Sequence, residues 1–377
     1  MNDNRVLSVG TLGNTKIDID ASSSCPWCDG LYLEPQVGAR KKMLPEDLEK
    51  LDIDFRQYRA VLVWHQFIHE PLLTFLHKFV KVDPSVLIIG NSHGYNKSVS
   101  ELLDIYGLNM PHYFTNYYSM WGPYFTDKYE EIYREKAGKK NILSLGSLRH
   151  DYLFKNVRWD KNKTNGKLLL IHEPDTAESW DDPSPIGDNR LSESIIEALD
   201  KANIPFDYKI HPNWPDFIGN TGTRMWQPPA HVNKVFIPIE EMSKYEAVVA
   251  SWSSSQFDAM AMGIPIINIE YDYPTISHSE WGPGKHGLLK PIKPGQIKSV
   301  FENSRHLQPL NQELINYFLG DLGRVGEHYY EFIKSKLNLR HKTGRALKRK
   351  FANGITHTKD LLRPVKKLLT PHMRGEA

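Results

Sequence analysis

At 377 residues the chain is longer than one hydrophobic core usually serves, so we expect two domains. Apolar residues make up 40% of the sequence and charged residues 24%, an ordinary globular composition that excludes a wholly disordered or fibrous protein. The N-terminus lacks a basic segment followed by an apolar run, and no stretch approaches the ~18 apolar residues of a membrane-spanning helix. A cytoplasmic protein is therefore expected.

The only two cysteines, Cys25 and Cys28, form a single Cys-Pro-Trp-Cys motif. They are too few for a disulfide framework, and they supply half of a four-cysteine zinc site. Locally the motif is similar to a glutaredoxin-type dithiol, but it follows a serine run and not a clean buried strand. Two interpretations remain open, a redox pair and two incidental thiols, and the sequence favours the second.

Short β-branched or aliphatic runs alternate with amphipathic stretches along the chain. Buried strands are expected at 61–64, 86–90, 142–145, 168–171, 206–210, 247–250 and 264–269. A helix at 191–202 places Ile195, Ile196 and Leu199 on one face, and a second helix at 256–262 is closed by Gly263. This alternation is typical of doubly wound α/β folds with parallel sheets.

The polar, turn-forming segment 156–167 is the expected boundary between two Rossmann-like domains, at 1–155 and 165–333. Residues 334–377 are a third region, because they carry thirteen Lys and Arg against Asp360 and Glu376, a balance of +11 that leaves −9 for the remainder. A basic tail on an acidic body indicates an anionic partner for the tail in particular.

Within the tail, apolar side chains that share one helical face alternate with the basic residues; they are Leu361, Leu362, Val365, Leu368 and Leu369. Such a basic amphipathic segment is expected to bind an anionic membrane surface at the inner face of the cell membrane. Nucleic acid fits less well, because no aromatic side chain for base stacking follows Phe351. A solvated charged terminus is the alternative.

The strand expected at 247–250 runs into Ser251, Ser253, Ser254 and Ser255 just before a helix. Free backbone N–H groups and the positive end of the helix dipole favour an anion there, and serine hydroxyls add donors. One serine would serve as an N-cap residue, whereas four exceed that role. Because ligands of open α/β sheets bind at the carboxyl ends of the strands, the sequence predicts a phosphate or pyrophosphate site.

This segment resembles a motif of the CDP-glycerol glycerophosphotransferase family, the teichoic-acid primases and polymerases, and more loosely other bacterial GT-B polysaccharide transferases. The family pattern Asp-Tyr-Ser-Ser, Phe-Asp, apolar-Pro and a later Asp corresponds to Ser251-Trp252-Ser253-Ser254, Phe257-Asp258, Ile264-Pro265 and Asp272. The resemblance implies a GT-B fold with two Rossmann-like domains facing a cleft, and donor contacts from Ser251, Ser253, Ser254, Asp258 and Asp272. Ser251 replaces the leading Asp, which leaves the identity of the donor open.

Further segments match the family's motifs in the same order along 85–290. His211, in a His-Pro step after an expected strand, resembles the donor-site histidine, which implies that it stabilises charge on the leaving pyrophosphate. His93 and Gly94, with Lys97 shortly after, resemble the acceptor-side His-Gly motif, which implies that His93 is the general base for the acceptor hydroxyl. For each histidine a local structural role is the alternative.

Arg149 lies in a segment, 145–153, that resembles the Gly-x-Pro-Arg-x-Asp-x-Leu motif closing the family's first domain, with Leu148 in place of the proline. The resemblance implies that Arg149 lies beside the interdomain cleft, where a guanidinium can hold a pyrophosphate through two hydrogen bonds. The alternative is a surface ion pair between Arg149 and Asp151, which would contribute little to stability.

The leading hypothesis is transfer of a glycosyl or polyol-phosphate group from a nucleotide-activated donor, CDP- or CMP-linked, to a hydroxyl of a lipid-linked acceptor or a cell-surface polysaccharide such as capsule or teichoic acid. The alternatives are a UDP-sugar glycosyltransferase or sugar-nucleotide epimerase of GT-B fold, and a non-catalytic polysaccharide- or nucleotide-binding protein. No metal is assigned to the Asp- and Pro-rich loop 173–185, and we expect a mechanism without metal or cofactor. Gly10 and Gly13 lack the third glycine of a dinucleotide loop, so an acceptor-facing loop is expected there.

Overall fold

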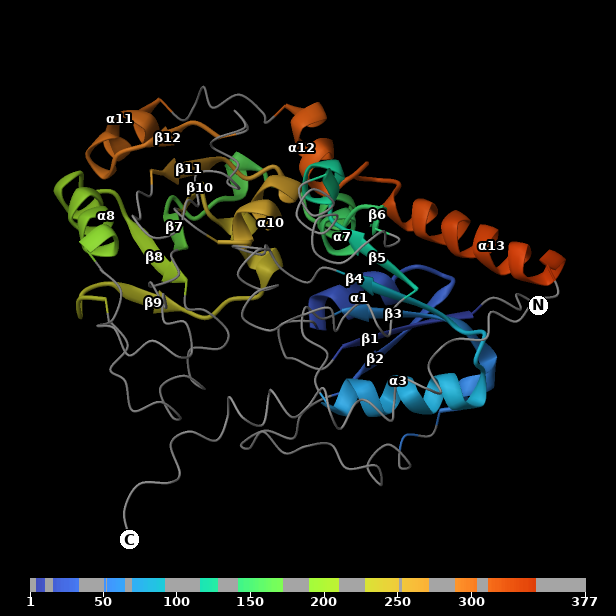
Figure 1. Ribbon diagram of the computed structural model, residues 1–377. Coiled ribbons are helices and arrows are strands. Elements are labelled where there is room, and N and C mark those ends of the chain that lie inside the picture. Colours follow the sequence, from blue (N-terminus) through green and yellow to red (C-terminus); the bar gives the residue numbers. More distant parts are fainter. Residues whose placement is uncertain are drawn as a thin grey trace, which may run out of the picture.

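The computed structural model describes residues 5–10, 16–33, 51, 53–64, 70–91, 116–127, 142–171, 190–209, 228–250, 253–270, 289–303 and 311–343. Within these ranges the chain forms two six-stranded sheets, and every strand pairing between neighbours is parallel. Figure 1 shows the two sheets in separate α/β domains that meet through helices near the middle of the molecule.

The first sheet has the strand order β2-β1-β3-β4-β5-β6. Its strands are β1 (Arg5–Gly10), β2 (Cys28–Tyr32), β3 (Tyr58–Trp64), β4 (Leu87–Asn91), β5 (Tyr117–Met120) and β6 (Ile142–Ser144). A 3₁₀ turn, η2 (Phe55–Gln57), leads into β3. Alternate residues of β3 point to opposite faces, so Val61 and Val63 pack in one core cluster and Leu62 in another.

Helices cover both faces of this sheet. Helix α3 (Glu70–Val82) places Leu72, Phe75, Leu76 and Phe79 at helical spacing against the face that carries Val61 and Val63. Helices α1 (Lys16–Ser23) and α7 (Leu148–Asn156) supply Ile19, Leu148 and Leu153 to the core on the other face. The first domain is therefore a doubly wound sheet, as the alternation of strands and helices predicted.

The second sheet has the strand order β12-β11-β10-β7-β8-β9. Its strands are β7 (Leu168–Ile171), β8 (Phe206–Lys209), β9 (Asn233–Val235), β10 (Ala247–Ala250), β11 (Ile266–Ile269) and β12 (Pro291–Ile292). Helices α8 (Arg190–Lys201) and α11 (Ile297–Glu302) pack on one face, and α10 (Ser255–Met262) packs on the other. Three 3₁₀ turns lie between these and the preceding elements: η3 (Lys161–Lys163), η4 (Ile239–Lys244) and η6 (Pro294–Gln296).

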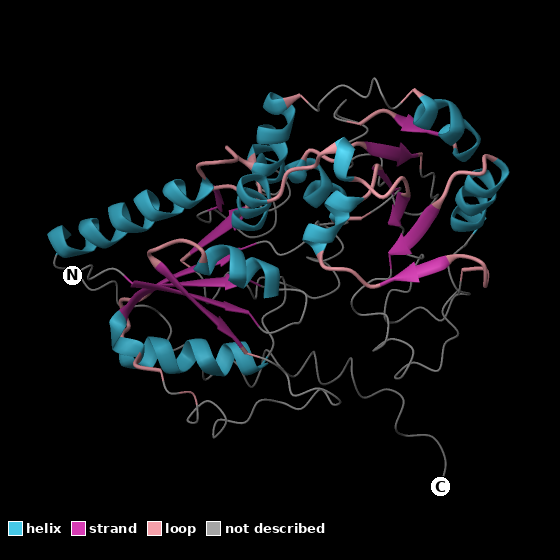
Figure 2. Ribbon diagram, turned by 180° about the vertical axis from the view of Figure 1, so that it is seen from behind, coloured by secondary structure: helices cyan, strands magenta, loops and turns pink. Residues whose placement is uncertain are grey.

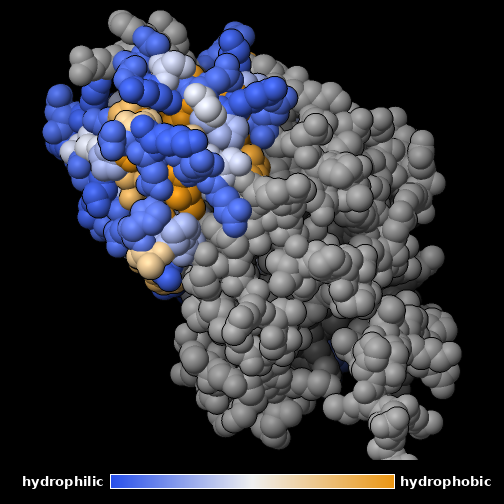
Figure 3. Space-filling model, turned by 90° about the vertical axis from the view of Figure 1, so that its left-hand side faces the viewer, coloured by the Kyte–Doolittle hydropathy of each residue, from blue (hydrophilic) through white to orange (hydrophobic). Residues whose placement is uncertain are grey.

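The two faces of the second sheet have different surroundings. The face under α8 and α11 turns outward, and the surface over it is largely hydrophilic, with a few apolar side chains showing between polar ones (Figure 3). The face under α10 contributes Leu169 and Val248, and α10 contributes Phe257, to the same core cluster as Leu62 and Ile19 of the first domain. One continuous apolar core therefore joins the two domains through α7 and α10.

All seven expected strands and both expected helices are present, and β7 and β10 have the expected bounds. The strand expected from 264 begins at Ile266, because the N–H of Ile264 still bonds the carbonyl of Ala259 and closes α10. Gly263 takes the left-handed conformation there, with φ +76°. Strands β1, β2 and β5 were not expected, and no bounds were predicted for β9 or β12; β2, β9 and β12 are edge strands.

Two helices after the second sheet return to the first domain (Figures 1 and 2). The carbonyl of Leu319, at the end of α12 (Gln312–Leu319), accepts from the N–H of Ser147 at 3.1 Å. Helix α13 (Val325–Thr343) buries Val325, Tyr329, Ile333 and Leu337, one residue every fourth position. The expected division between 333 and 334 therefore falls inside α13, and 325–333 lie against the first domain.

No helix among the described residues combines the length and the apolar composition needed to cross a membrane. The basic tail beyond α13, at 344–377, lies outside the described residues together with its expected amphipathic face.

Candidate functional site

The second sheet has a topological switch point between β7 and β10. From β7 the chain continues to β8 and β9 on one side, and from β10 it continues to β11 and β12 on the other. Ligands of open α/β sheets bind outside the carboxyl ends of the strands at such a point. Ser253 and Ser254 follow the carboxyl end of β10 and lead directly into α10, so this turn has the place in the fold that a phosphate site requires.

The serines of this turn have different roles. Ser253 is buried, and its Oγ accepts from the N–H of Ser255 at 3.2 Å. Ser254 occupies the N-cap position of α10, is half-buried and makes no capping hydrogen bond through its side chain. The N–H groups of Gln256 and Phe257 bond the carbonyls of Ser253 and Ser254 at 3.1 Å. The turn therefore offers an anion the positive end of the helix dipole and the Ser254 hydroxyl, and not a row of free N–H groups.

Arg149 and Asp258 bind each other across the domain junction. The Nε of Arg149 donates to Asp258 Oδ1 at 2.7 Å, and its Nη2 donates to Oδ2, which makes the pair bidentate. Arg149 is 5% exposed and Asp258 0% exposed. Both side chains were expected to contact the donor, and in this arrangement such a contact requires the pair to separate. The alternative pairing of Arg149 with Asp151 does not occur.

Charges explain how this pair stays ionised. Burial opposes ionisation of Asp258, but the positive charge of Arg149 outweighs it and holds the pKa of the carboxyl at about 2. Burial likewise disfavours the charged guanidinium, but the carboxylates of Asp258 and Asp18 outweigh it and raise the pKa of Arg149. Asp18 is itself buried in the first turn of α1. The first turns of α1, α7 and α10 thus bring their charged side chains into one buried cluster.

His150 is a member of this cluster that sequence reasoning missed. It is fully buried, its Nε2 lies 3.3 Å from Asp258 Oδ1, and its ring meets Trp121 edge-on with centroids 4.7 Å apart. Burial lowers its pKa, so the imidazole is neutral at neutral pH. The sequence offered one signal, the histidine directly after the arginine in the segment where a helix starts.

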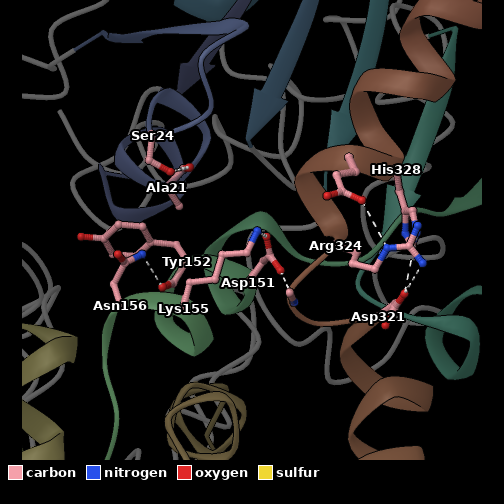
Figure 4. Close-up of polar contacts among 11 residues, drawn as sticks. Ala21, Ser24, Asp151, Tyr152, Lys155, Asn156, Asp321, Arg324 and His328 are labelled. Carbon is pink, nitrogen blue, oxygen red and sulfur yellow. Dashed lines mark hydrogen bonds and ion pairs between the residues drawn. The ribbon is translucent and has the colours of Figure 1, made fainter.

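Asp151, two residues after Arg149, faces the opposite way. Its carboxylate accepts from the N–H of Gly323, in the connection between α12 and α13, and from Lys155 Nζ at 2.9 Å. Figure 4 shows α7 with Asp151 and Lys155, placed between α1 with Ala21 and the chain segment that carries Asp321 and Arg324. Helix α7 is therefore anchored to the first domain on one side and to α10 on the other.

The acceptor-side residues His93, Gly94 and Lys97 lie outside the described residues, and so do the expected donor-site residues His211, Ser251 and Asp272. The strand that leads to His93 is described: β4 ends at Asn91, which is buried. Tyr329 of α13 donates to Asn91 Oδ1 at 2.6 Å. The last residue of the strand that precedes the His-Gly motif is thus held by α13.

The cysteine pair has the environment of structural thiols. Cys28 is buried in β2 and Cys25 is half-buried, in the turn before β2. Burial raises the pKa of both thiols, so both are protonated at neutral pH. A protonated thiol is a poor nucleophile, which favours incidental thiols over a redox pair. Among the described residues no group of three or more His, Cys, Asp or Glu side chains could hold a metal ion.

The sequence matches no protein-family model and none of the curated proteins. Solved structures with similar folds include a UDP-GlcNAc 2-epimerase from Methanocaldococcus jannaschii, which is 12% identical with a TM-score of 0.52 and aligns over 88% of this chain and 99% of its own. A Listeria monocytogenes protein assigned as a UDP-N-acetylglucosamine 2-epimerase is 12% identical, with a TM-score of 0.52 and coverage of 88% and 97%.

The wall teichoic acid polymerase TagF, in a His-to-Asn variant with CDPG, is 11% identical with a TM-score of 0.50, and the alignment covers 90% of each chain. At these identities the likeness shows the fold alone. The chain has two parallel-sheet α/β domains arranged as in these GT-B-like proteins.

Proposed function

We propose that this protein is a transferase that binds a nucleotide-activated donor at the carboxyl end of β10 and transfers a glycosyl or polyol-phosphate group to a hydroxyl. The observation that carries the proposal is the Ser253–Ser254 turn at the switch point of the second sheet. A helix N-terminus whose N-cap hydroxyl, here that of Ser254, makes no capping hydrogen bond favours a phosphate. Proteins of similar fold are described with UDP-GlcNAc and UDP or with CDPG, which supports a nucleotide-linked ligand for this fold.

In this proposal Ser254 and Ser253 contact the donor pyrophosphate, and His211 stabilises the charge that develops on the leaving group. His93 removes the proton from the acceptor hydroxyl, because an imidazole has a pKa near neutrality. CDP- or CMP-linked donors are proposed from the motif resemblance, and a lipid-linked or polysaccharide hydroxyl is the proposed acceptor. Arg149 and Asp258 bind each other, so we propose no direct role for them on the donor.

A binding screen identifies the donor class. Titration calorimetry and thermal shift would be measured with CMP, CDP, UDP, GDP and their sugar or glycerol conjugates, because a ligand of the native state stabilises by RT ln(1 + [L]/Kd). One nucleotide that clearly binds names the donor class. Incubation with UDP-GlcNAc and no acceptor tests the epimerase alternative directly. If none of these ligands binds, the proposal is rejected.

Replacing both Ser253 and Ser254 with alanine should weaken the binding of the nucleoside diphosphate and leave that of the free nucleoside unchanged, because the hydroxyls contact phosphate and not the base. A hydrogen bond to a charged group contributes about 1.5–3 kcal/mol, so diphosphate affinity should fall at least about tenfold. Ser299→Ala is the control, since Ser299 is an exposed serine of α11 in the same domain. Equal losses for diphosphate and nucleoside would reject this geometry.

A further inference from the structure

We propose that Arg149 and Asp258 form a positioning pair that fixes the N-terminal turn of α10, and with it Ser253 and Ser254, relative to the first domain. The inference rests on the proposed function in so far as the ligand at this turn is the donor phosphate. It assigns these two side chains to a contact between protein elements, where the motif resemblance implied contact with the donor.

The pair lies one helical turn from the proposed phosphate site. Asp258 is in the first turn of α10, four residues after the N-cap residue Ser254. Arg149 is in the first turn of α7, which follows the last strand of the first sheet. The two residues are 109 positions apart in the chain and join one domain to the other. Any rotation of α10 about its axis therefore moves Ser254 and the Asp258 carboxylate together.

The geometry of the contact specifies one orientation. Both oxygens of Asp258 are used by the guanidinium, and Oδ1 also lies 3.3 Å from His150 Nε2. A bidentate pair fixes both distance and angle, whereas apolar contact is non-directional. Apolar contacts lie beside the pair: Phe257 of α10 packs edge-on against Trp121 and Phe125, with ring centroids 5.5 and 5.8 Å apart. The ion pair adds a charged, bidentate contact to this aromatic packing.

Helix α7 is also held on the side that faces away from α10. Because α7 is held there, its ion pair can position α10. Asp151 accepts from the backbone of Gly323, and α7 packs against α1. Helix α7 thus belongs to the framework of the first domain, and Arg149 extends from that framework. A buried ion pair adds little net stability compared with apolar side chains of similar size. The role of this pair is therefore better explained by the orientation of α10 than by stability.

The double variant Arg149→Met with Asp258→Leu separates positioning from stability. Apolar replacement of both partners removes the buried charges, and such replacements are often neutral or stabilising. We expect wild-type resistance to urea, but donor affinity at least about tenfold weaker and faster backbone hydrogen exchange across 253–262. Wild-type stability combined with wild-type affinity and exchange would overturn the proposal, because the pair would then be structural only.

Two further variants complete the test. Arg149→Lys keeps the charge but loses the bidentate contact, so we expect donor binding to be at least about fivefold weaker. Unchanged affinity would contradict the proposal. Asp207→Asn is the matched control: Asp207 is a buried carboxylate that binds Lys167, Asn233 and Tyr245, all in the second domain and none in α10. It should lower stability and leave donor affinity unchanged.

The binding probe is the nucleoside diphosphate that gives the largest thermal shift with the wild-type protein. If the wild-type protein binds no nucleotide, the proposed function fails, and the positioning proposal is then decided by hydrogen exchange alone. Faster exchange across 253–262 in a stable double variant supports it, and unchanged exchange rejects it.

Discussion

The pKa of His150 is set by its buried position at the domain junction. It has no exposed surface, and neither ring nitrogen has a well-aligned hydrogen bond among the described residues. Burial lowers its pKa below the usual 6.5, while Asp258 stays ionised with a pKa of about 2. Protonation of His150 would place a second positive charge beside Arg149 in a buried site, which disfavours the folded state.

We therefore expect the free energy of unfolding to fall on mild acidification. In the unfolded chain His150 binds a proton near pH 6.5, and in the folded protein it does so only at lower pH, so stability is lost as the pH falls through this window. The loss is about 1.4 kcal/mol per pH unit for one such group. Asp258 contributes its own loss only below about pH 4, as the pH approaches its folded pKa of about 2.

Urea unfolding of the wild-type protein and His150→Gln, measured between pH 7.5 and 5, tests this. The free energy of unfolding of the variant should depend less steeply on pH, because the variant lacks the titration of His150 and the two proteins share all other histidines. His231→Gln serves as the control, since His231 is exposed and pairs with Asp200 at the surface. Parallel pH profiles for the wild-type protein and His150→Gln would show that His150 does not titrate as its burial requires.

The connections between elements are most tightly packed where the chain returns to the first domain. Gly320 follows α12 with φ +87°, and a Cβ at this position would lie 2.5 Å from the Cα of Gly146, in the turn between β6 and α7. Gly146 also has positive φ, and its own Cβ would meet Val325 of α13. Only glycine permits two backbones to approach this closely. This contact allows α13 to lie on the first sheet.

Gly320→Ala should therefore be much more destabilising than Gly263→Ala. Gly263 is in the left-handed region, which costs an alanine about 1–2 kcal/mol, and a Cβ there meets nothing within 4 Å. Gly320, with φ +87° and ψ −178°, is in a region that essentially only glycine adopts. The clash with Gly146 adds about 1–3 kcal/mol at position 320. Denaturant unfolding of the two variants measures the difference. Equal destabilisation would mean that the two turns do not pack as closely as the structure shows.

At the scale of the whole molecule, the net charge is divided between a folded body and a basic tail. Helix α13 ends at Thr343, and the segment after it carries nine of the thirteen Lys and Arg residues of 334–377. We propose that this tail binds an anionic membrane surface, where each Lys or Arg contributes about 1 kcal/mol to the binding free energy. Truncation after Thr343 removes the tail without shortening a described helix.

Full-length protein should sediment with anionic liposomes, less so at high salt, and the form truncated after Thr343 should not. Neutral liposomes should bind neither form. A full-length variant with serine at Leu361, Leu362, Leu368 and Leu369 keeps the charge and tests the apolar face separately; it should bind more weakly than the wild-type protein. If truncation leaves binding to anionic liposomes unchanged, the tail is not the membrane contact.

The sequence by itself determined the features that depend on local pattern. Buried parallel strands such as β7 and β10 are continuous apolar runs, so their bounds could be predicted, and Gly263 marked the end of α10 because few other residues take its conformation. The position of Ser253 and Ser254 at the start of a helix followed from the same pattern.

Only the tertiary structure decided which surfaces meet. That α13 lies on the first domain follows from no local pattern, because contacts such as that of Tyr329 with Asn91 join residues 238 positions apart in the chain. Arg149 and Asp258 belong to different domains, and each alone could be a donor contact or a surface charge. Their pairing depends on how α7 and α10 pack, and that packing is set by the apolar core that both domains share.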